Sequence, residues 1–239
     1  LHLLSRRQRQ MCIRDSYDFV ESYKENCEKT AGKGLMCMFS GNHDVDRLAR
    51  HLHGDELKVA FAFILSMPGA PFIYYGDEIG MRYVEGLKSV EGGYNRTGSR
   101  SPMQWDDSTN AGFSSAPASD LYIAMDPDKD RPTAKKEMAA PDSLYHEVKK
   151  LIRIRQSHKA LQSRGKITFV YAEKNTYPLA YIREDGDEKI LVIINAAAEA
   201  KTFACDAEPK EAIYNFGAAA EAKNGKITVP AQSAGFYRI

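Results

Sequence analysis

Residues 34–47 read Gly-Leu-Met-Cys-Met-Phe-Ser-Gly-Asn-His-Asp-Val-Asp-Arg, and this stretch predicts how the chain is built. The apolar run from Gly34 to Phe39 is typical of a buried strand. Polar and ionisable side chains follow from Ser40 to Arg47, and a helical pattern begins near Asp55. In α/β enzymes a rigid strand holds functional groups in this way, at a mouth that opens to solvent.

The same kinds of element occur on both sides of this stretch. Helical spacing of apolar residues predicts helices over residues 18–29 and 57–67, and a second apolar run predicts a strand over residues 71–75. Apolar runs without alternation favour a parallel sheet that is buried on both faces. Asp77 and Glu78 then place two carboxylates just after the second strand.

The second half of the chain has a different pattern. Residues 80–141 are rich in Gly, Ser, Asp and Pro, so we expect a long loop that builds a binding surface or contains short elements of its own. A helix is predicted over residues 144–157. Period-two alternation then predicts an antiparallel sandwich, with strands at residues 167–171, 179–181, 190–194, 213–214, 227–229 and 236–239. The predicted fold is therefore α/β, followed by an all-β domain.

Composition excludes several classes of partner. The chain has 43% hydrophobic and 27% charged residues, and a formal net charge of +1. Its scattered Lys and Arg give no electrostatic basis for binding nucleic acid or an anionic membrane surface. The longest apolar run, Val59 to Tyr75, is interrupted by proline and glycine and is too short to cross a bilayer. The four cysteines lack metal-ligand or redox spacing, so we expect reduced thiols in a cytoplasmic protein.

Residues 1–16, LHLLSRRQRQMCIRDS, differ from the rest of the chain. Their arginines follow a short apolar opening, which is the reverse of the order in a signal peptide. The string QMCIRDS looks like translated sequencing-adapter sequence. We therefore predict that residues 1–16 are an extraneous leader and that the protein proper enters near Tyr17.

Asn42-His43-Asp44 at a strand tip is compatible with three kinds of site. His43 and Asp44 could bind a metal ion, but adjacent residues rarely both reach one ion and no second His has a supporting spacing. Taken alone, the motif favours a structural role, in which an Asp caps the next helix and a His is hydrogen-bonded in the core. The third possibility is a carboxylate and an imidazole that face a polar substrate.

Four segments in order favour the third possibility. Residues 39–50, FSGNHDVDRLAR, resemble the end of barrel strand seven in the α-amylase family of glycoside hydrolases, and residues 69–81, GAPFIYYGDEIGM, resemble its strand eight. Residues 96–114, RTGSRSPMQWDDSTNAGFS, are similar to a segment of its oligo-1,6-glucosidase, α-glucosidase and trehalose synthase branch. Residues 142–161 resemble its last barrel helix. The resemblance implies that residues 17–162 are the C-terminal portion of a (β/α)₈ barrel and residues 163–239 a β-sandwich.

The resemblance also implies roles for single residues. Asp44 matches the carboxylate that binds sugar hydroxyls and stabilises an oxocarbenium-like transition state, and His43 matches a histidine that binds the same ring. Arg47 matches an arginine that orients Asp44 or contacts substrate; a surface ion pair with Asp46 or Asp55 is the open alternative. Arg100 is expected at the pocket rim.

The remaining conspicuous residues are expected to be structural. Asn42 should fix the turn, and Asp77 and Glu78 should hold the loop after the second strand rather than line the pocket. Trp105 is expected to anchor the long loop rather than to stack on sugar.

Two catalytic carboxylates of the family have no match here. Retaining glycosidases need a nucleophile and a separate acid/base residue. The family's Gly-x-Arg-x-Asp nucleophile pattern is absent from the sequence, and no segment matches the acid/base Glu. We therefore expect these residues to form the last part of such an enzyme, inactive and poorly folded by itself.

The expected activity is hydrolysis of α-glucosidic bonds in short oligosaccharides. Transfer of the glucosyl group within the substrate, as in trehalose synthase, is an alternative. A barrel relative that has lost its catalytic carboxylates and serves as a partner of a transporter is a second alternative, and a carbohydrate-binding sandwich is a third. No cofactor is predicted and no metal-ligand set is visible; calcium sites of the family lie mostly in segments that have no match here.

Overall fold

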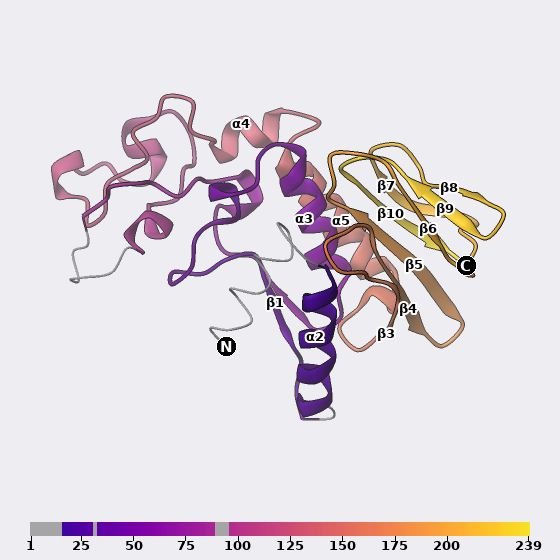
Figure 1. Ribbon diagram of the computed structural model, residues 1–239. Coiled ribbons are helices and arrows are strands. Elements are labelled where there is room, and N and C mark those ends of the chain that lie inside the picture. The colour runs from indigo at the N-terminus through magenta and orange to yellow at the C-terminus, as the bar shows by residue number, and fades with distance from the viewer. Residues whose placement is uncertain (1–15, 31–32, 89–95) are drawn as a thin grey trace. The chain divides into compact units, whose positions relative to one another are not determined.

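A computed structural model describes residues 16–30, 33–88 and 96–239 (Figure 1). The prediction for residues 1–16 therefore lies outside the described residues, apart from Ser16, which begins a helix. The helices are α2 (Ser16–Thr30), α3 (Asp55–Ser66), α4 (Ala134–Ala139) and α5 (Leu144–Ser157). The first two strands are β1 (Cys37–Phe39) and β2 (Ala70–Phe72), and the later ones are β3 (Lys166–Tyr171), β4 (Leu179–Asp185), β5 (Glu188–Asn195), β6 (Lys201–Ala204), β7 (Ala212–Phe216), β8 (Glu221–Lys223), β9 (Lys226–Val229) and β10 (Ser233–Arg238).

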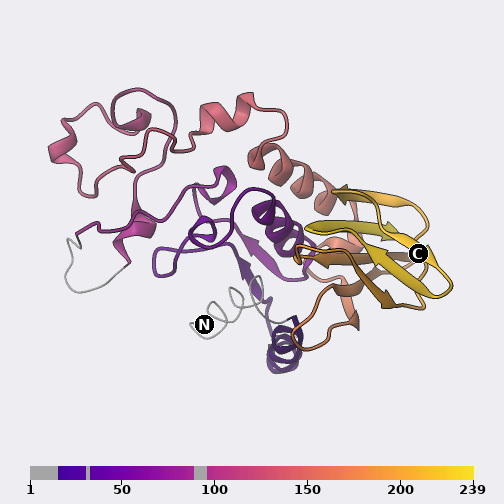
Figure 2. The same ribbon diagram turned by 45° about the horizontal axis from the view of Figure 1, so that its top comes forward.

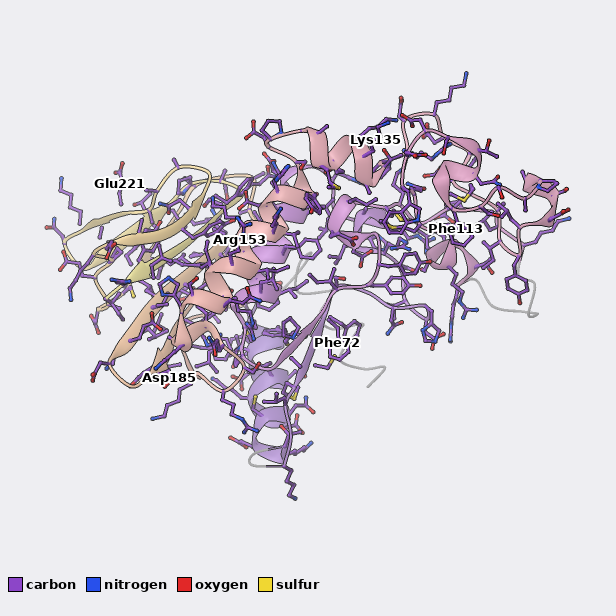
Figure 3. All side chains as sticks on the ribbon, turned by 180° about the vertical axis from the view of Figure 1, so that it is seen from behind. Phe72, Phe113, Lys135, Arg153, Asp185 and Glu221 are labelled. Atoms are coloured by element: carbon purple, nitrogen blue, oxygen red, sulfur yellow. The ribbon has the colours of Figure 1, made fainter. Side chains whose placement is uncertain are left out.

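Strands β1 and β2 form a two-stranded parallel sheet, as the apolar runs predict. The amide of Ala70 donates to the carbonyl of Met36 at 2.8 Å, and the amide of Ser40 donates to the carbonyl of Phe72 at 3.0 Å. Both partners advance along the chain together, which is the parallel pattern. Each strand is only three residues long. Figure 3 marks Phe72 at the end of β2, where its side chain is exposed.

Helix α3 is buried more completely than its sequence pattern predicts. The pattern places apolar residues on one face, but every residue from Val59 to Ser66 is buried. A helix that is apolar on all sides belongs in the interior of a protein. Its C-terminal end is held by Arg155 of α5, which donates to the carbonyls of Leu65 and Met67, both at 2.7 Å, and of Gly69 at 2.9 Å.

Residues 166–238 form the predicted antiparallel sandwich (Figure 2). One sheet has the order β3-β4-β5-β10-β7 and the other the order β6-β9-β8. A core of seven buried residues fills the space between them: Ala180, Leu191, Ile193, Phe203, Ile227, Val229 and Tyr237. The sequence pattern missed β6 and β8. It correctly placed the β8–β9 turn, where Asn224 and Gly225 both have positive φ, as a tight hairpin requires.

The larger sheet is covered on its second face by helices. Tyr181 of β4 is fully buried, and its hydroxyl bonds that of Ser66 on α3 at 2.6 Å. Phe169 of β3 packs edge-on against Tyr23 of α2, with ring centroids 6.0 Å apart. This sheet is therefore the middle layer of three, which explains why β5 is buried along both of its faces.

Two compact units divide the chain. The first contains the described residues within Leu1–Met38, Lys58–Pro71 and Lys150–Ile239, and the second contains Phe39–Leu57 and the described residues within Phe72–Lys149. We call these the sandwich unit and the loop unit. The loop unit includes α4 and several short 3₁₀ helices, in the region expected to be a long loop. The assignment of residues 17–162 to a barrel and 163–239 to a separate domain stays a prediction.

Candidate active site at the end of strand β1

The tip after β1 is a tight turn that Asn42 holds in place. The Asn42 side chain accepts a hydrogen bond from the amide of Asp44 at 2.7 Å, and the amide of Val45 donates to the Asn42 carbonyl at 3.3 Å. Asparagine is favoured here because its side chain bonds the backbone two residues further on. Asn42 therefore fixes the turn, as the sequence predicts.

The turn presents the carboxylate of Asp44 to two guanidinium groups. Oδ1 of Asp44 lies 2.9 Å from Nη1 of Arg96 and 3.3 Å from Nη2 of Arg100, and Oδ2 lies 3.6 Å from Nε2 of His43. The Asp44 side chain is 27% exposed and that of His43 is 68% exposed. His43, Asp44 and Arg100, which are three of the predicted site residues, therefore lie in contact at a solvent-accessible position.

A short 3₁₀ helix, Thr97–Arg100, brings the arginines to this turn. Nε of Arg100 donates to the carbonyl of His43 at 2.9 Å, and the hydroxyl of Ser99 donates to the carbonyl of Val45 at 2.6 Å. Gly98 allows the close approach, because a Cβ there would lie 2.3 Å from the carbonyl oxygen of Val84. Two side chains of this segment therefore clamp the backbone of the turn, and two bind its carboxylate.

Sequence reasoning missed Arg96. Its signal was the spacing, since Arg96 and Arg100 stand four residues apart around small residues, and one turn of helix brings such positions to the same side. The intervening Thr-Gly-Ser is typical of a loop, so the sequence pattern hides the helical turn that pairs the two arginines.

Electrostatics keep Asp44 ionised. Partial burial raises its pKa, but the hydrogen bond from Arg96 and the charges of His43, Arg96 and Arg100 outweigh this, so the pKa of Asp44 lies below its usual range. A carboxylate in this state accepts hydrogen bonds from hydroxyl groups and stabilises nearby positive charge.

Arg47 is buried and does not lie at the surface. Its side chain is fully buried, with Nη1 2.9 Å from Oδ1 of Asp77 and 2.7 Å from the carbonyl oxygen of Tyr75. The surface ion pair with Asp46 or Asp55 is wrong, since Asp46 pairs with Arg50 at 2.9 Å instead. The predicted contact with substrate has no support in this arrangement, because the guanidinium is turned toward Asp77 and away from solvent.

Trp105 helps to hold its loop through its backbone, while about half of its side chain is exposed. The side chain is 52% exposed. Its backbone is the fixed part: the amide donates to the carbonyl of Ala111 at 2.8 Å, and the carbonyl accepts from Lys135 at 2.9 Å. The sequence shows that a large aromatic residue is present, but not which part of it makes the contacts.

Within residues 16–30, 33–88 and 96–239, no group of three or more His, Cys, Asp or Glu side chains is placed to hold a metal ion. In the same residues no helix combines the length and apolar character that a membrane span requires.

The chain is similar in sequence and in fold to known glycoside hydrolases. The sequence model of the family described as "Alpha amylase, catalytic domain" matches residues 4–164. Glucan 1,6-alpha-glucosidase from Streptococcus pneumoniae serotype 4 is 29% identical over 230 residues, covering 82% of this chain and 42% of that protein. Oligo-1,6-glucosidase from Parageobacillus thermoglucosidasius is 30% identical over 206 residues, covering 72% and 36%.

Two further matches are to proteins that are not named as glucosidases. An amino acid transporter heavy chain from Homo sapiens is 30% identical over 187 residues, covering 74% of this chain and 25% of that protein. The crystal structure of a MutB mutant in complex with its substrate sucrose superposes with a TM-score of 0.80 at 25% identity, covering 94% of this chain and 47% of that one. The chain thus spans less than half the length of each of these relatives.

Proposed function

The chain belongs to the α-amylase family of glycoside hydrolases, and from this premise we propose that it forms part of a retaining enzyme acting on α-glucosidic bonds of short oligosaccharides. The relatives named as 1,6-glucosidases support this substrate class. One observation carries the proposal: Asp44 is an ionised, partly exposed carboxylate, held by Arg96 and Arg100 at the end of a strand of a parallel pair.

Asp44 would act on the sugar ring without attacking it. Its oxygens accept hydrogen bonds from sugar hydroxyls, and its charge offsets the positive charge that develops on the ring in the oxocarbenium-like transition state. Arg96 and Arg100 keep the carboxylate ionised and fix its orientation, so the charge is in place before the reaction begins. His43, beside it and largely exposed, would donate to the same ring.

The nucleophile and the acid/base residue would come from a part of the protein outside these 239 residues. In a retaining glycosidase those two carboxyl groups flank the scissile bond about 5–5.5 Å apart. Without them Asp44 has no bond-breaking partner. We therefore propose that the 239-residue chain does not hydrolyse glucosides by itself.

The test is a pair of variants in the protein encoded by the complete reading frame. Asp44→Asn should lower kcat/KM on isomaltose roughly 10²–10³-fold, because it removes one group that stabilises transition-state charge. Asp46→Asn is the matched control, since this carboxylate is two residues away and similarly exposed but pairs with Arg50. Equal activity of the wild type and Asp44→Asn would contradict the role. Release of the aryl group from an aryl α-glucoside by the 239-residue chain would contradict its inactivity.

Two other functions are supported by single similarities. MutB is described as a trehalulose synthase, and its fold similarity supports an isomerase that transfers glucose within the substrate. Products formed from sucrose separate the two outcomes, since an isomerase yields a second disaccharide and a hydrolase yields free glucose. The transporter heavy chain supports a partner protein. A reading frame without Gly-x-Arg-x-Asp or the acid/base Glu would favour that function. The cytoplasmic location stays a prediction.

A further inference from the structure

Asp77 binds both ends of the turn that carries Asp44. Its Oδ2 accepts a hydrogen bond from the hydroxyl of Ser40 at 2.7 Å, and its Oδ1 accepts one from Arg47 at 2.9 Å. Ser40 precedes Asn42-His43-Asp44 and Arg47 follows it. The Asp77 side chain is buried, with only 1% of its surface exposed. One carboxyl group therefore closes the turn into a loop whose two ends cannot separate without breaking a buried contact.

The backbone of the turn also lies directly against this carboxyl group. A Cβ at Gly41 would be 2.8 Å from Oδ2 of Asp77, which is closer than a real Cβ comes to another atom. Gly41 is therefore fitted to Asp77, and the position of the backbone just before Asn42 depends on where that oxygen lies.

Residues around Asp77 connect it to the end of β2. The hydroxyl of Ser40 also accepts from the amide of Tyr74 at 3.0 Å, and Nη1 of Arg47 donates to the carbonyl of Tyr75 at 2.7 Å. The Arg47 guanidinium lies 4.8 Å from the centroid of each of these two rings. Tyr74 and Tyr75, which follow β2, therefore contact the same Ser40 and Arg47 side chains that bind Asp77.

Arg47 depends on Asp77 for its only carboxylate among the described residues. Its Nε and Nη2 are buried and have no hydrogen-bond acceptor there. A buried guanidinium with unused donors is held by the few contacts it has, so loss of Asp77 would leave only the Tyr75 carbonyl and the two rings.

We infer that Asp77 is a positioning residue, which fixes the turn through Ser40 and Arg47 and so sets where Asp44 meets its substrate. This inference rests on the proposed function of Asp44. It assigns Asp77 a bridging role through shape and hydrogen bonds, so a neutral residue of the same shape should retain part of that role.

Hydrogen exchange of single amides tests the inference without any turnover. Asp77→Ala removes both oxygens, and we expect the amides of Asp44 and Val45 to exchange about tenfold faster or more, as loss of buried hydrogen bonds allows local opening. Asp77→Asn keeps the shape and an acceptor oxygen but leaves the Arg47 cation without its carboxylate, so its rates should lie between those of Asp77→Ala and the wild type. Asp120→Ala, an exposed aspartate of the same unit, is the control and should change nothing.

The reference amides are those of Ala134 and Lys135, which belong to the same unit and bond the carbonyls of Gln104 and Trp105. They should keep their wild-type rates in every variant. Unchanged rates at Asp44 and Val45 in Asp77→Ala would overturn the inference, and so would equal acceleration of the reference amides. If Asp77→Ala does not fold, Ser40→Ala breaks one link only; it should still accelerate the Asp44 amide, and a wild-type rate would overturn the inference. Failure of the proposed function would appear instead in the activity of Asp44→Asn.

Discussion

Two fully buried arginines, Arg47 in the loop unit and Arg183 in the sandwich unit, have their charge stabilised by different kinds of group. Among the described residues, Arg47 has one carboxylate, one carbonyl and two unused nitrogens. In the same part of the chain, Arg183 uses all three of its nitrogens and bonds only backbone carbonyls, those of Ser66, Leu161, Gln162, Gly165 and Lys166. Arg47 therefore makes one ion pair, whereas Arg183 joins the backbone at Ser66 to that of residues 161–166.

The pKa values follow from this difference. Burial lowers the pKa of Arg183 to about 10, because carbonyl dipoles only partly replace water around the cation. In the loop unit it is the acid that responds: burial raises the pKa of Asp77 to about 6, despite the opposing effect of Arg47 and Ser40. The cost of burial is therefore seen in the carboxyl group of Asp77 in the loop unit and in the guanidinium of Arg183 in the sandwich unit, where the surrounding carbonyls do not titrate.

The largest effect is expected from Arg183→Met, which removes the buried guanidinium group of the sandwich unit. Five carbonyls would lose their hydrogen bond from Arg183, three of them in buried hydrogen bonds, and the free energy of unfolding should fall by about 4 kcal/mol or more. Chemical denaturation followed by circular dichroism measures this. Arg164→Met is the control, since Arg164 is exposed one residue before Gly165, and its effect should be within about 0.5 kcal/mol. A small effect of Arg183→Met would mean that water replaces the guanidinium.

Arg47→Met removes the buried guanidinium group of the loop unit. The free energy of unfolding should fall by about 3 kcal/mol at pH 8, because the Asp77 carboxylate would be left buried and unpaired. The cost should shrink at pH 5, where the carboxyl group takes up a proton instead. The double variant Arg47→Met with Asp77→Asn gives the matched comparison, since it removes the charge as well as its partner. A cost that does not change with pH would contradict the pairing.

The pH dependence of the free energy of unfolding of the wild type tests the raised pKa of Asp77 directly. In the folded chain the pKa of Asp77 is raised from 3.8 to about 6. Its contribution to the stability of the fold is therefore most favourable below about pH 3.8 and is lost as the pH rises through 6. The difference in unfolding free energy between the wild type and Asp77→Asn should therefore fall by roughly 2–3 kcal/mol from pH 4 to pH 7. Denaturation at several pH values measures it. A flat difference would mean that Asp77 titrates in the folded chain as it does in solution.

The smallest effect is expected where guanidinium groups meet an exposed carboxylate. Arg96→Ala should raise the pKa of Asp44 toward its usual range, because Arg96 contributes both a hydrogen bond and a charge. The free energy of unfolding should change by at most about 1 kcal/mol, since solvent screens such pairs. Carbon-13 NMR titration of the Asp44 carboxyl group measures the shift. Arg153→Ala, on the exposed side of α5 (Figure 3), should leave that pKa unchanged.

The sequence predicted those parts of the molecule that depend on local pattern. The helices over 18–29, 57–67 and 144–157 and the two parallel strands appear within a few residues, because apolar spacing and flanking glycines determine them locally. His43, Asp44 and Arg100 were placed together through similarity of segments, and the structure brings them within 3.6 Å. Strands β6 and β8 were missed because short, largely polar edge strands lack alternation.

The buried arginines show why the rest could not be predicted. Arg47 stands beside Asp46 in the sequence, and its partner Asp77 is 30 residues away. Arg183 occupies a position in β4 that alternation would assign to one face of a sheet, without indicating that carbonyls of Ser66 and of residues 161–166 surround it. Contacts between distant residues depend on the assembled fold, so a local pattern of charges does not identify them.

Trp105 gives the chain a built-in optical reporter. It is the one tryptophan beside 13 tyrosines, and it lies in the loop unit with half of its side chain exposed. Selective excitation of tryptophan would therefore follow the loop unit alone, while tyrosine emission would come from both units. Quenching of Trp105 by a small neutral solute would show whether a bound sugar or protein partner covers the surface around it, without any label.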